Sequence, residues 1–264
     1  MVEANARVGQ IAYIIKNGDY SERRKIEGQE GFGDLIEDVN RDGEIVKKNL
    51  KETFGFKVSE IREINNASFN DFKEIMGDLK DQMNDHEERG VALNALVYYA
   101  GHGLQKTMSY AATNSKKDYP LEKMLRTIAS GRIKTHIAAV FDCCRSEMKT
   151  RGTAGGAGDS GDDDDEAGQT NLILTFACPP SSTTPAKSTI SVQYFEQLKK
   201  KVNPATGMVE FKDALIGWRN TDRQAETIAF SPYSMKLRLV GYKPTGSADA
   251  GAVNAAQAEE IAQL

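Results

Sequence analysis

The sequence lacks the features that mark several large classes of protein. Its 264 residues include only three cysteines, two of them adjacent, so no disulfide framework is expected. No apolar run reaches the length of a membrane-spanning helix, and the first residues have no signal-peptide core. The formal charge of −4 gives no electrostatic reason to expect binding to nucleic acid or to an anionic membrane. We therefore expect a cytoplasmic protein with free thiols.

Apolar runs alternate along the chain with stretches of helical periodicity. The patterns predict strands at 8–16, 56–61, 93–99, 136–142, 171–177 and 234–240, with a small hairpin at 107–113. They predict helices at 42–54, 68–84, 120–130, 190–202 and 209–220. This alternation predicts the α/β class, with a six-stranded, mostly parallel sheet and helices on both faces.

Two of the predicted strands end in residues that can do chemistry. The strand at 93–99 runs into Gly101-His102-Gly103, where the glycines leave the imidazole uncrowded. The strand at 136–142 runs into Cys143 and Cys144. Parallel strands end at the same edge of a sheet, so these two stretches are expected to face each other. A neighbouring imidazole is the usual base that converts a thiol to a thiolate.

Both stretches resemble motifs of one peptidase clan. Tyr-Tyr-Ala-Gly-His-Gly at 98–103 is similar to the histidine motif of the caspase–paracaspase–metacaspase clan, and Asp-Cys-Cys-Arg at 142–145 is similar to its cysteine motif. The aspartate two places before the second cysteine is the paracaspase and metacaspase form, although Ser146-Glu147 departs from the clan pattern. The resemblance covers residues 8–243, is closest to paracaspases and metacaspases, and implies the caspase-like (caspase–hemoglobinase) fold.

The resemblance implies a catalytic dyad. Cys144 would be the nucleophile, His102 the acid and base, and the backbone amides of Cys144 and Gly103 the oxyanion hole. Cys143 competes for the role of nucleophile, but Arg145 and the spacing from the aspartate select Cys144. The alternative is that Cys144 is a buried thiol and His102 a structural turn residue.

The resemblance also implies a substrate preference. In paracaspases and metacaspases the residue that matches Asp142 lines the S1 pocket, which implies cleavage after Arg or Lys. Asp42 fits the position of a second pocket acid best, and Asp38 is the alternative. Either residue could instead be an N-cap or first-turn acid of the predicted helix. A third acid is not evident, because 179–184 contains none.

The chain organisation matches that of the resembled clan. A large-subunit-like part (1–150) and a small-subunit-like part (170–243) flank an acidic, flexible linker (151–169), and an Ala/Gly-rich tail follows (244–264). The sequence requires no cofactor and indicates no metal ligand set, but calcium binding by the acidic run at 159–166 stays open. Basic residues just before the linker are compatible with self-cleavage there.

We therefore expect a cysteine endopeptidase that cleaves protein or peptide substrates after basic residues through an acyl-enzyme. The alternative is a catalytically weak or inactive caspase-like interaction or dimerisation module. The sequence leaves open whether the protein is a monomer or a homodimer.

Overall fold

The computed structural model describes residues 8–27, 33–104, 109–114, 117–144, 170–178, 190–218, 226–230 and 235–242. Its centre is a six-stranded sheet with the order β10-β8-β7-β3-β1-β2. The strands span Gly9–Lys16 (β1), Ile61–Asn65 (β2), Leu93–Ala100 (β3), Thr135–Asp142 (β7), Leu172–Phe176 (β8) and Glu226–Ala229 (β10). All pair in parallel except β10, which is antiparallel to β8. The α/β class and the mostly parallel six-stranded sheet are confirmed.

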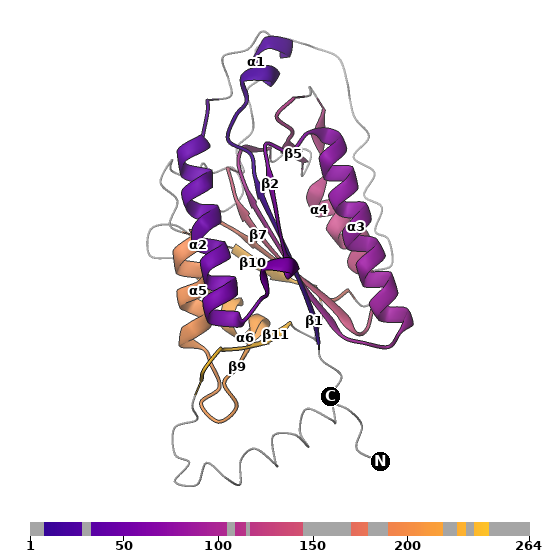
Figure 1. Cartoon of the computed structure of the whole chain (residues 1–264), viewed down its shortest axis with the longest axis vertical. Coiled ribbons are helices and arrows are strands. Elements are labelled where there is room, and N and C mark those ends of the chain that lie inside the picture. The colour runs from indigo at the N-terminus through magenta and orange to yellow at the C-terminus, as the bar shows by residue number, and fades with distance from the viewer. Residues whose placement is uncertain are drawn as a thin grey trace.

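Helices cover both faces of this sheet (Figure 1). The helices α2 (Ile36–Phe54), α5 (Ile190–Lys200) and α6 (Phe211–Leu215) pack on one face, and α3 (Phe69–Glu88) and α4 (Leu121–Ala129) pack on the other. Consecutive side chains of a strand point to opposite faces of the sheet. Tyr98 therefore packs in the core beneath α2, α5 and α6, and Tyr99 packs in the core beneath α3 and α4. Burial on both faces explains the near-continuous apolar sequence of β3.

Smaller elements lie outside the main sheet. Helix α1 (Ser21–Glu27) follows β1 and lies beyond the carboxyl ends of the strands, at the top of Figure 1. The strands β4 (Gly103–Leu104), β5 (Ser109–Ala111) and β6 (Asp118–Tyr119) form a three-stranded antiparallel sheet, larger than the hairpin predicted for 107–113. The strands β9 (Met208–Glu210) and β11 (Lys236–Arg238) form a two-stranded antiparallel sheet.

Helix termini follow local chemistry that the sequence shows. Ser68 caps α3, because its hydroxyl accepts a hydrogen bond from the Asp71 amide at 3.1 Å while the Asp71 carboxylate accepts one from the Ser68 amide at 2.7 Å. Helix α2 ends at Phe54 with Gly55 as its C-cap, as predicted. It begins earlier than predicted, at Ile36, because no N-cap residue marks its start: Leu35 holds that position without a side-chain hydrogen bond.

Two predicted elements are wrong, and a third, a strand, lies outside the main sheet in which it was expected. The strand predicted at 56–61 is a short 3-10 helix, η1 (Val58–Glu60), before β2; Phe56 instead packs in the core beneath α2, where its amide donates to the Leu50 carbonyl at 3.0 Å. The helix predicted at 209–220 is β9 followed by the single turn of α6. The strand predicted at 234–240 contains β11, which pairs with β9, so β10 is the sixth strand of the main sheet.

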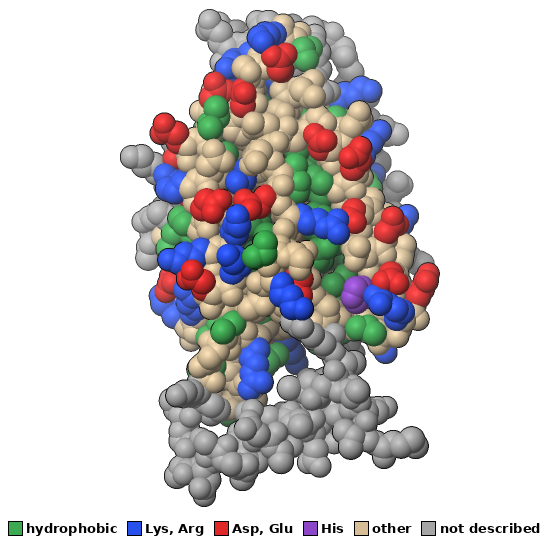
Figure 2. All heavy atoms as spheres, viewed as in Figure 1, with side chains coloured by type: hydrophobic (Ala, Val, Ile, Leu, Met, Phe, Trp, Pro, Cys, Tyr) green, Lys and Arg blue, Asp and Glu red, His purple; other side chains and the backbone are tan. Residues whose placement is uncertain are grey.

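The surface around α2 and α3 carries both signs of charge. Figure 2 shows Lys and Arg side chains interleaved with Asp and Glu side chains across this face, without a field of one sign. Among the described residues, no helix has the length and apolar character needed to cross a membrane.

Candidate active site

The two motifs meet at one edge of the sheet. Strands β3 and β7 pair in register up to Ala100 and Asp142, so the residues that follow leave the sheet side by side. A Cβ atom at Gly103 would lie 2.4 Å from the Cys144 carbonyl oxygen and 2.7 Å from the Cys143 sulfur. Only glycine permits this approach, which brings the backbone of the histidine motif against that of the cysteine motif.

The imidazole of His102 is oriented by a backbone carbonyl. Its Nε2 lies 2.9 Å from the Gly33 carbonyl oxygen, which can only accept a hydrogen bond. The neutral ring therefore carries its proton on Nε2 and its lone pair on Nδ1, the atom that can act as a base. Burial lowers the pKa of His102, the charge of Arg23 lowers it further, and the Gly33 hydrogen bond and Asp34 oppose this shift. The ring is thus held in its neutral, basic form.

Two tyrosines hold the backbone of the histidine turn. The Tyr99 hydroxyl donates to the His102 carbonyl at 2.7 Å, and the His102 amide donates to the Tyr20 hydroxyl at 3.0 Å. The Tyr20 ring also packs edge-on against the imidazole, with ring centres 4.7 Å apart. Gly101 has a φ of +154°, and a Cβ there would lie within 2.9 Å of both tyrosine hydroxyls and of the Asn17 carbonyl. A side chain at Gly101 would displace these contacts.

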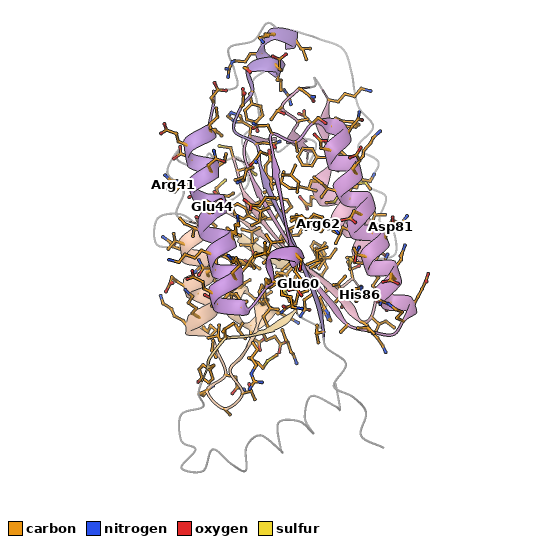
Figure 3. The ribbon with its side chains drawn as sticks, in the orientation of Figure 1. Arg41, Glu44, Glu60, Arg62, Asp81 and His86 are labelled. Carbon is orange, nitrogen blue, oxygen red and sulfur yellow. The ribbon has the colours of Figure 1, made fainter. Side chains whose placement is uncertain are left out.

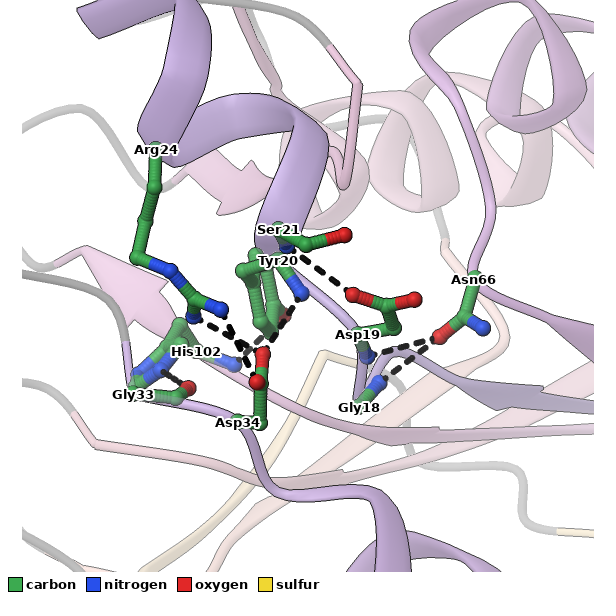
Figure 4. A network of polar contacts seen from close by, with 9 residues as sticks. All are labelled: Gly18, Asp19, Tyr20, Ser21, Arg24, Gly33, Asp34, Asn66 and His102. Atoms are coloured by element: carbon green, nitrogen blue, oxygen red, sulfur yellow. Dashed lines mark hydrogen bonds and ion pairs between the residues drawn. The ribbon is translucent and has the colours of Figure 1, made fainter. Parts of the chain in front are cut away.

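The segment that carries the Gly33 carbonyl is fastened by an ion pair (Figure 4). Both Asp34 carboxylate oxygens accept hydrogen bonds from Arg24 of α1, at 2.8 and 2.9 Å, and Asp34 also accepts one from the Tyr20 amide at 3.1 Å. The Arg24 hydrogen bonds, more than any other contact, lower the pKa of Asp34 to about 2. Arg24 and Asp34 are therefore candidate positioning residues for His102.

Sequence reasoning missed this support for His102. It identified the imidazole but none of Tyr20, Arg24, Gly33 or Asp34. A backbone carbonyl has no residue-type signature, and the polar stretch after β1 contains no motif. The Arg and Asp of the ion pair are ten residues apart in a segment without helical periodicity, so no spacing rule joins them.

The three cysteines differ in exposure. Cys144 is partly exposed, whereas Cys143 and Cys178 are buried, and none of the three forms a disulfide. The Cys178 sulfur lies 3.5 Å from the Cys143 carbonyl oxygen, to which it donates. Cys144 is thus the thiol most open to a substrate, as expected of the nucleophile; its role stays a prediction. Arg145 and Ser146-Glu147 lie outside the described residues.

We call the three candidate acids, Asp38, Asp42 and Asp142, the acidic cluster: Asp142 contacts Tyr98, the charge of Asp42 also acts on Tyr98, and Asp38 shares Arg41 with Asp42. Asp142, the last residue of β7, is 7% exposed and accepts a hydrogen bond from the Tyr98 hydroxyl at 2.9 Å. Burial raises the pKa of Tyr98 well above its ordinary value, and the charges of Asp142 and Asp42 raise it further. The structure therefore places the Asp142 carboxylate of β7 on the Tyr98 hydroxyl, and the Asp42 carboxylate of α2 near enough for its charge to act on that hydroxyl.

The two acids of α2 differ in position. Asp38 lies in the first turn of the helix, and its side chain is 28% exposed. Asp42 lies one turn later and is 4% exposed, so the alternative that it is an N-cap is wrong. Burial raises the pKa of Asp42, whereas hydrogen bonds from Arg41 and Ser191 lower it.

Other predicted features fall outside the described residues. They are the linker at 151–169 with its acidic run, the 179–184 stretch examined for a third acid, and the tail at 244–264. Within the ranges that are described, no three His, Cys, Asp or Glu side chains are grouped so as to hold a metal ion.

Comparison with known proteins decides the family. The sequence model of the caspase domain, a peptidase family, matches residues 10–222. The chain belongs to the caspase domain family. No curated protein shows a significant sequence match to it. The crystal structure of Caspase-1 from Spodoptera frugiperda is similar to this caspase domain with a TM-score of 0.56 over 88% of this chain and 93% of that one, at 12% identity.

The family assignment confirms the resemblance seen in the sequence. His102 and Cys144 of this caspase domain both lie within the matched residues, as do all three acids of the acidic cluster. The likeness to Caspase-1 at 12% identity shows the fold, and the narrower assignment to paracaspases or metacaspases stays a prediction.

Proposed function

We propose that the chain is a cysteine endopeptidase that uses a Cys144–His102 dyad and cleaves after Arg or Lys. The observation that carries this proposal is the junction of the two motifs, in which Gly103 packs against Cys143 and Cys144 while the Gly33 carbonyl fixes the His102 ring. The caspase domain family assignment supports cysteine peptidase chemistry at this junction.

The chemistry follows from the tautomer of His102. Nδ1 accepts the Cys144 thiol proton, and the thiolate attacks the carbonyl carbon of the scissile peptide bond. The backbone amides of Cys144 and Gly103 stabilise the oxyanion of the tetrahedral intermediate. The carbon–nitrogen bond then breaks, and His102 gives its proton to the departing amine. A water molecule, deprotonated by His102, attacks the acyl-enzyme and releases the acid product, while the proton returns to the thiolate.

The acidic cluster supports a basic P1 side chain. Three carboxylates attract a guanidinium or ammonium group and repel an acidic side chain. In the resembled paracaspases and metacaspases, the residue that matches Asp142 has this role. We therefore infer that Asp142 makes the main P1 contact, with Asp42 and Asp38 adding to the field.

The test uses two fluorogenic peptides that differ only in Arg or Asp at P1, with and without calcium. We expect the protein to hydrolyse the Arg peptide alone and Cys144→Ala to abolish this. The matched control is Cys143→Ala, which removes the adjacent thiol and is expected to keep measurable turnover. Preference for the Asp peptide, or turnover that survives Cys144→Ala, would contradict the proposal.

Further parts of the proposal concern regulation and location. We propose that self-cleavage near 151–169 follows from the same preference, and intact-mass spectrometry of an active preparation tests this. Calcium binding by 159–166, dimer formation and a cytoplasmic location stay predictions. The alternative of a non-catalytic interaction module gains support only if neither peptide is hydrolysed, even after limited proteolysis.

A further inference from the structure

Arg41 is bound to two of the three acids of the acidic cluster. Its Nε and Nη2 donate to the two carboxylate oxygens of Asp42 at 3.0 and 3.1 Å, and its Nη1 donates to Asp38 at 2.9 Å. Figure 3 shows Arg41 on the first half of α2. One guanidinium thus occupies the side of the acidic cluster that α2 contributes.

This pairing is unusual for a helix. Neighbouring residues of a helix point in directions about 100° apart, so i and i+1 side chains do not normally face each other. The Arg41 side chain nevertheless reaches both carboxylate oxygens of Asp42, which is 4% exposed. A carboxylate that is removed from water needs a charged or hydrogen-bonding partner, and Arg41 supplies it together with the Ser191 hydroxyl at 3.2 Å.

Arg41 presents the same chemical group as a P1 arginine. Both oxygens of Asp42 already accept hydrogen bonds from Arg41, so a second guanidinium cannot make the same two-pronged contact while Arg41 stays in place. The Arg41 side chain is 42% exposed, and this long chain can turn into solvent without unpacking the core.

We propose that Arg41 is a resident counter-ion that competes with a basic P1 side chain for the acidic cluster and swings into solvent when a substrate binds. Arg41 is then a specificity-determining residue: it weakens ground-state binding of basic substrates without touching the reacting atoms. This inference rests on the proposed function, because it assumes that basic P1 side chains reach the acidic cluster.

The test compares Arg41→Ala with Arg126→Ala, using the Arg peptide at pH 8, because a high pH favours the ionised form of Asp42, whose pKa is raised by burial. Arg126 is a close match, because its side chain is 38% exposed and pairs with Glu122, whose side chain is 4% exposed, on α4 across the sheet. We expect Arg41→Ala to lower KM about fivefold with kcat unchanged, and to lower the inhibition constant of agmatine, a free guanidinium probe, by a similar factor. Arg126→Ala should change neither value.

A second variant distinguishes a specific effect of Arg41 from a folding defect. Arg41→Lys keeps the positive charge but not the fork of donors, so its KM should fall between those of the unsubstituted protein and Arg41→Ala. An unchanged or raised KM in both Arg41 variants, with the unsubstituted protein active on the Arg peptide, would overturn this inference alone. Failure of the unsubstituted protein to cleave the Arg peptide would overturn the proposed function and this inference with it.

Discussion

His102 follows β3 and Asp142 ends the neighbouring strand β7 at the same sheet edge, yet the two residues are held in different ways. His102 is fixed mainly by neutral groups: the Gly33 carbonyl and the hydroxyls of Tyr20 and Tyr99. The acidic cluster is held by charged or strongly polar side chains, among them Tyr98 and Arg41.

This difference implies that catalysis and substrate specificity depend on different kinds of contact. Neutral contacts to the backbone keep their geometry over a wide range of salt and pH, which suits a ring that must hold one tautomer. The free energy of a buried carboxylate changes when any one of its partners is removed, because charged groups in a poorly solvated site interact strongly. Changes around His102 should therefore alter kcat, and changes around the acidic cluster should alter KM.

The largest effect is expected where the two motifs touch. Gly103→Ala would place a methyl group 2.4 Å from the Cys144 carbonyl oxygen. Relief of that clash must shift the backbone of the dyad, so we expect kcat to fall about a hundredfold or more. Gly77→Ala is the control, since nothing lies within 4 Å of the added methyl on α3, and it should raise stability by up to about 1 kcal/mol. Equal kcat values for Gly103→Ala and Gly77→Ala would contradict the close contact between Gly103 and the Cys144 carbonyl oxygen.

The next largest effect is expected when one charge is removed from the acidic cluster. Asp142→Asn keeps the shape of the side chain but loses a charge-assisted contact, so kcat/KM for the Arg peptide should fall about 30-fold, mostly through KM. Asp38→Asn, at the exposed end of the cluster, should have a smaller effect. A fall in kcat without a rise in KM would place Asp142 outside P1 recognition.

The pH dependence tests the neutral state of His102. Only the neutral ring accepts a proton, so activity is lost as the pH falls through the pKa of His102. Burial lowers this pKa from its ordinary value of 6.5, so the midpoint of the acid limb of kcat/KM should lie below that pH. Activity should fall about tenfold per pH unit beneath the midpoint. A midpoint above 6.5 would contradict the desolvated, neutral ring.

A smaller effect is expected from the hydroxyl that supports Asp142. Tyr98→Phe removes the 2.9 Å hydrogen bond, so KM for the Arg peptide should rise about fivefold with kcat unchanged. Tyr194→Phe is the matched control: this buried hydroxyl has no hydrogen-bond partner in the described part of the chain, so its loss should leave KM and stability unimpaired. Equal rises in KM would point to a general packing defect.

The smallest effect is expected at the ion pair behind the Gly33 carbonyl. Arg24→Gln breaks an exposed pair, so kcat should fall only about twofold. High salt should lower the kcat of the unsubstituted protein toward that of Arg24→Gln, since salt screens exposed charges. Lys25→Gln, which alters a neighbouring exposed pair on α1, should leave kcat unchanged. A salt response identical in both variants would exclude the positioning role.

The sequence was sufficient for the parts of the site that depend on residue type. Strands buried on both faces have near-continuous apolar sequence, so β3 and β7 were predicted, and with them the meeting of the histidine and cysteine motifs. The sequence also identifies Asp142 and Asp42; the structure places Asp142 on the Tyr98 hydroxyl, and the charge of Asp42 acts on the same hydroxyl.

Other features could not be predicted, for physical reasons. The Gly33 carbonyl acts through its backbone, which every residue has. The strand β10 is only four residues long, and its place beside β8 depends on tertiary pairing. Arg41 and Asp42 are sequence neighbours that a helix normally points apart, so no spacing rule would pair them.

The most direct test of the account is covalent labelling with a thiol-directed peptidyl-arginine probe, followed by mass spectrometry to locate the modified residue. The account predicts labelling at Cys144 alone, loss of labelling in His102→Ala, slower labelling in Asp142→Asn, and no reaction with the matching peptidyl-aspartate probe. Modification at Cys143 or Cys178, or preference for the aspartate probe, would contradict the Cys144–His102 dyad or the acidic cluster as its P1 site.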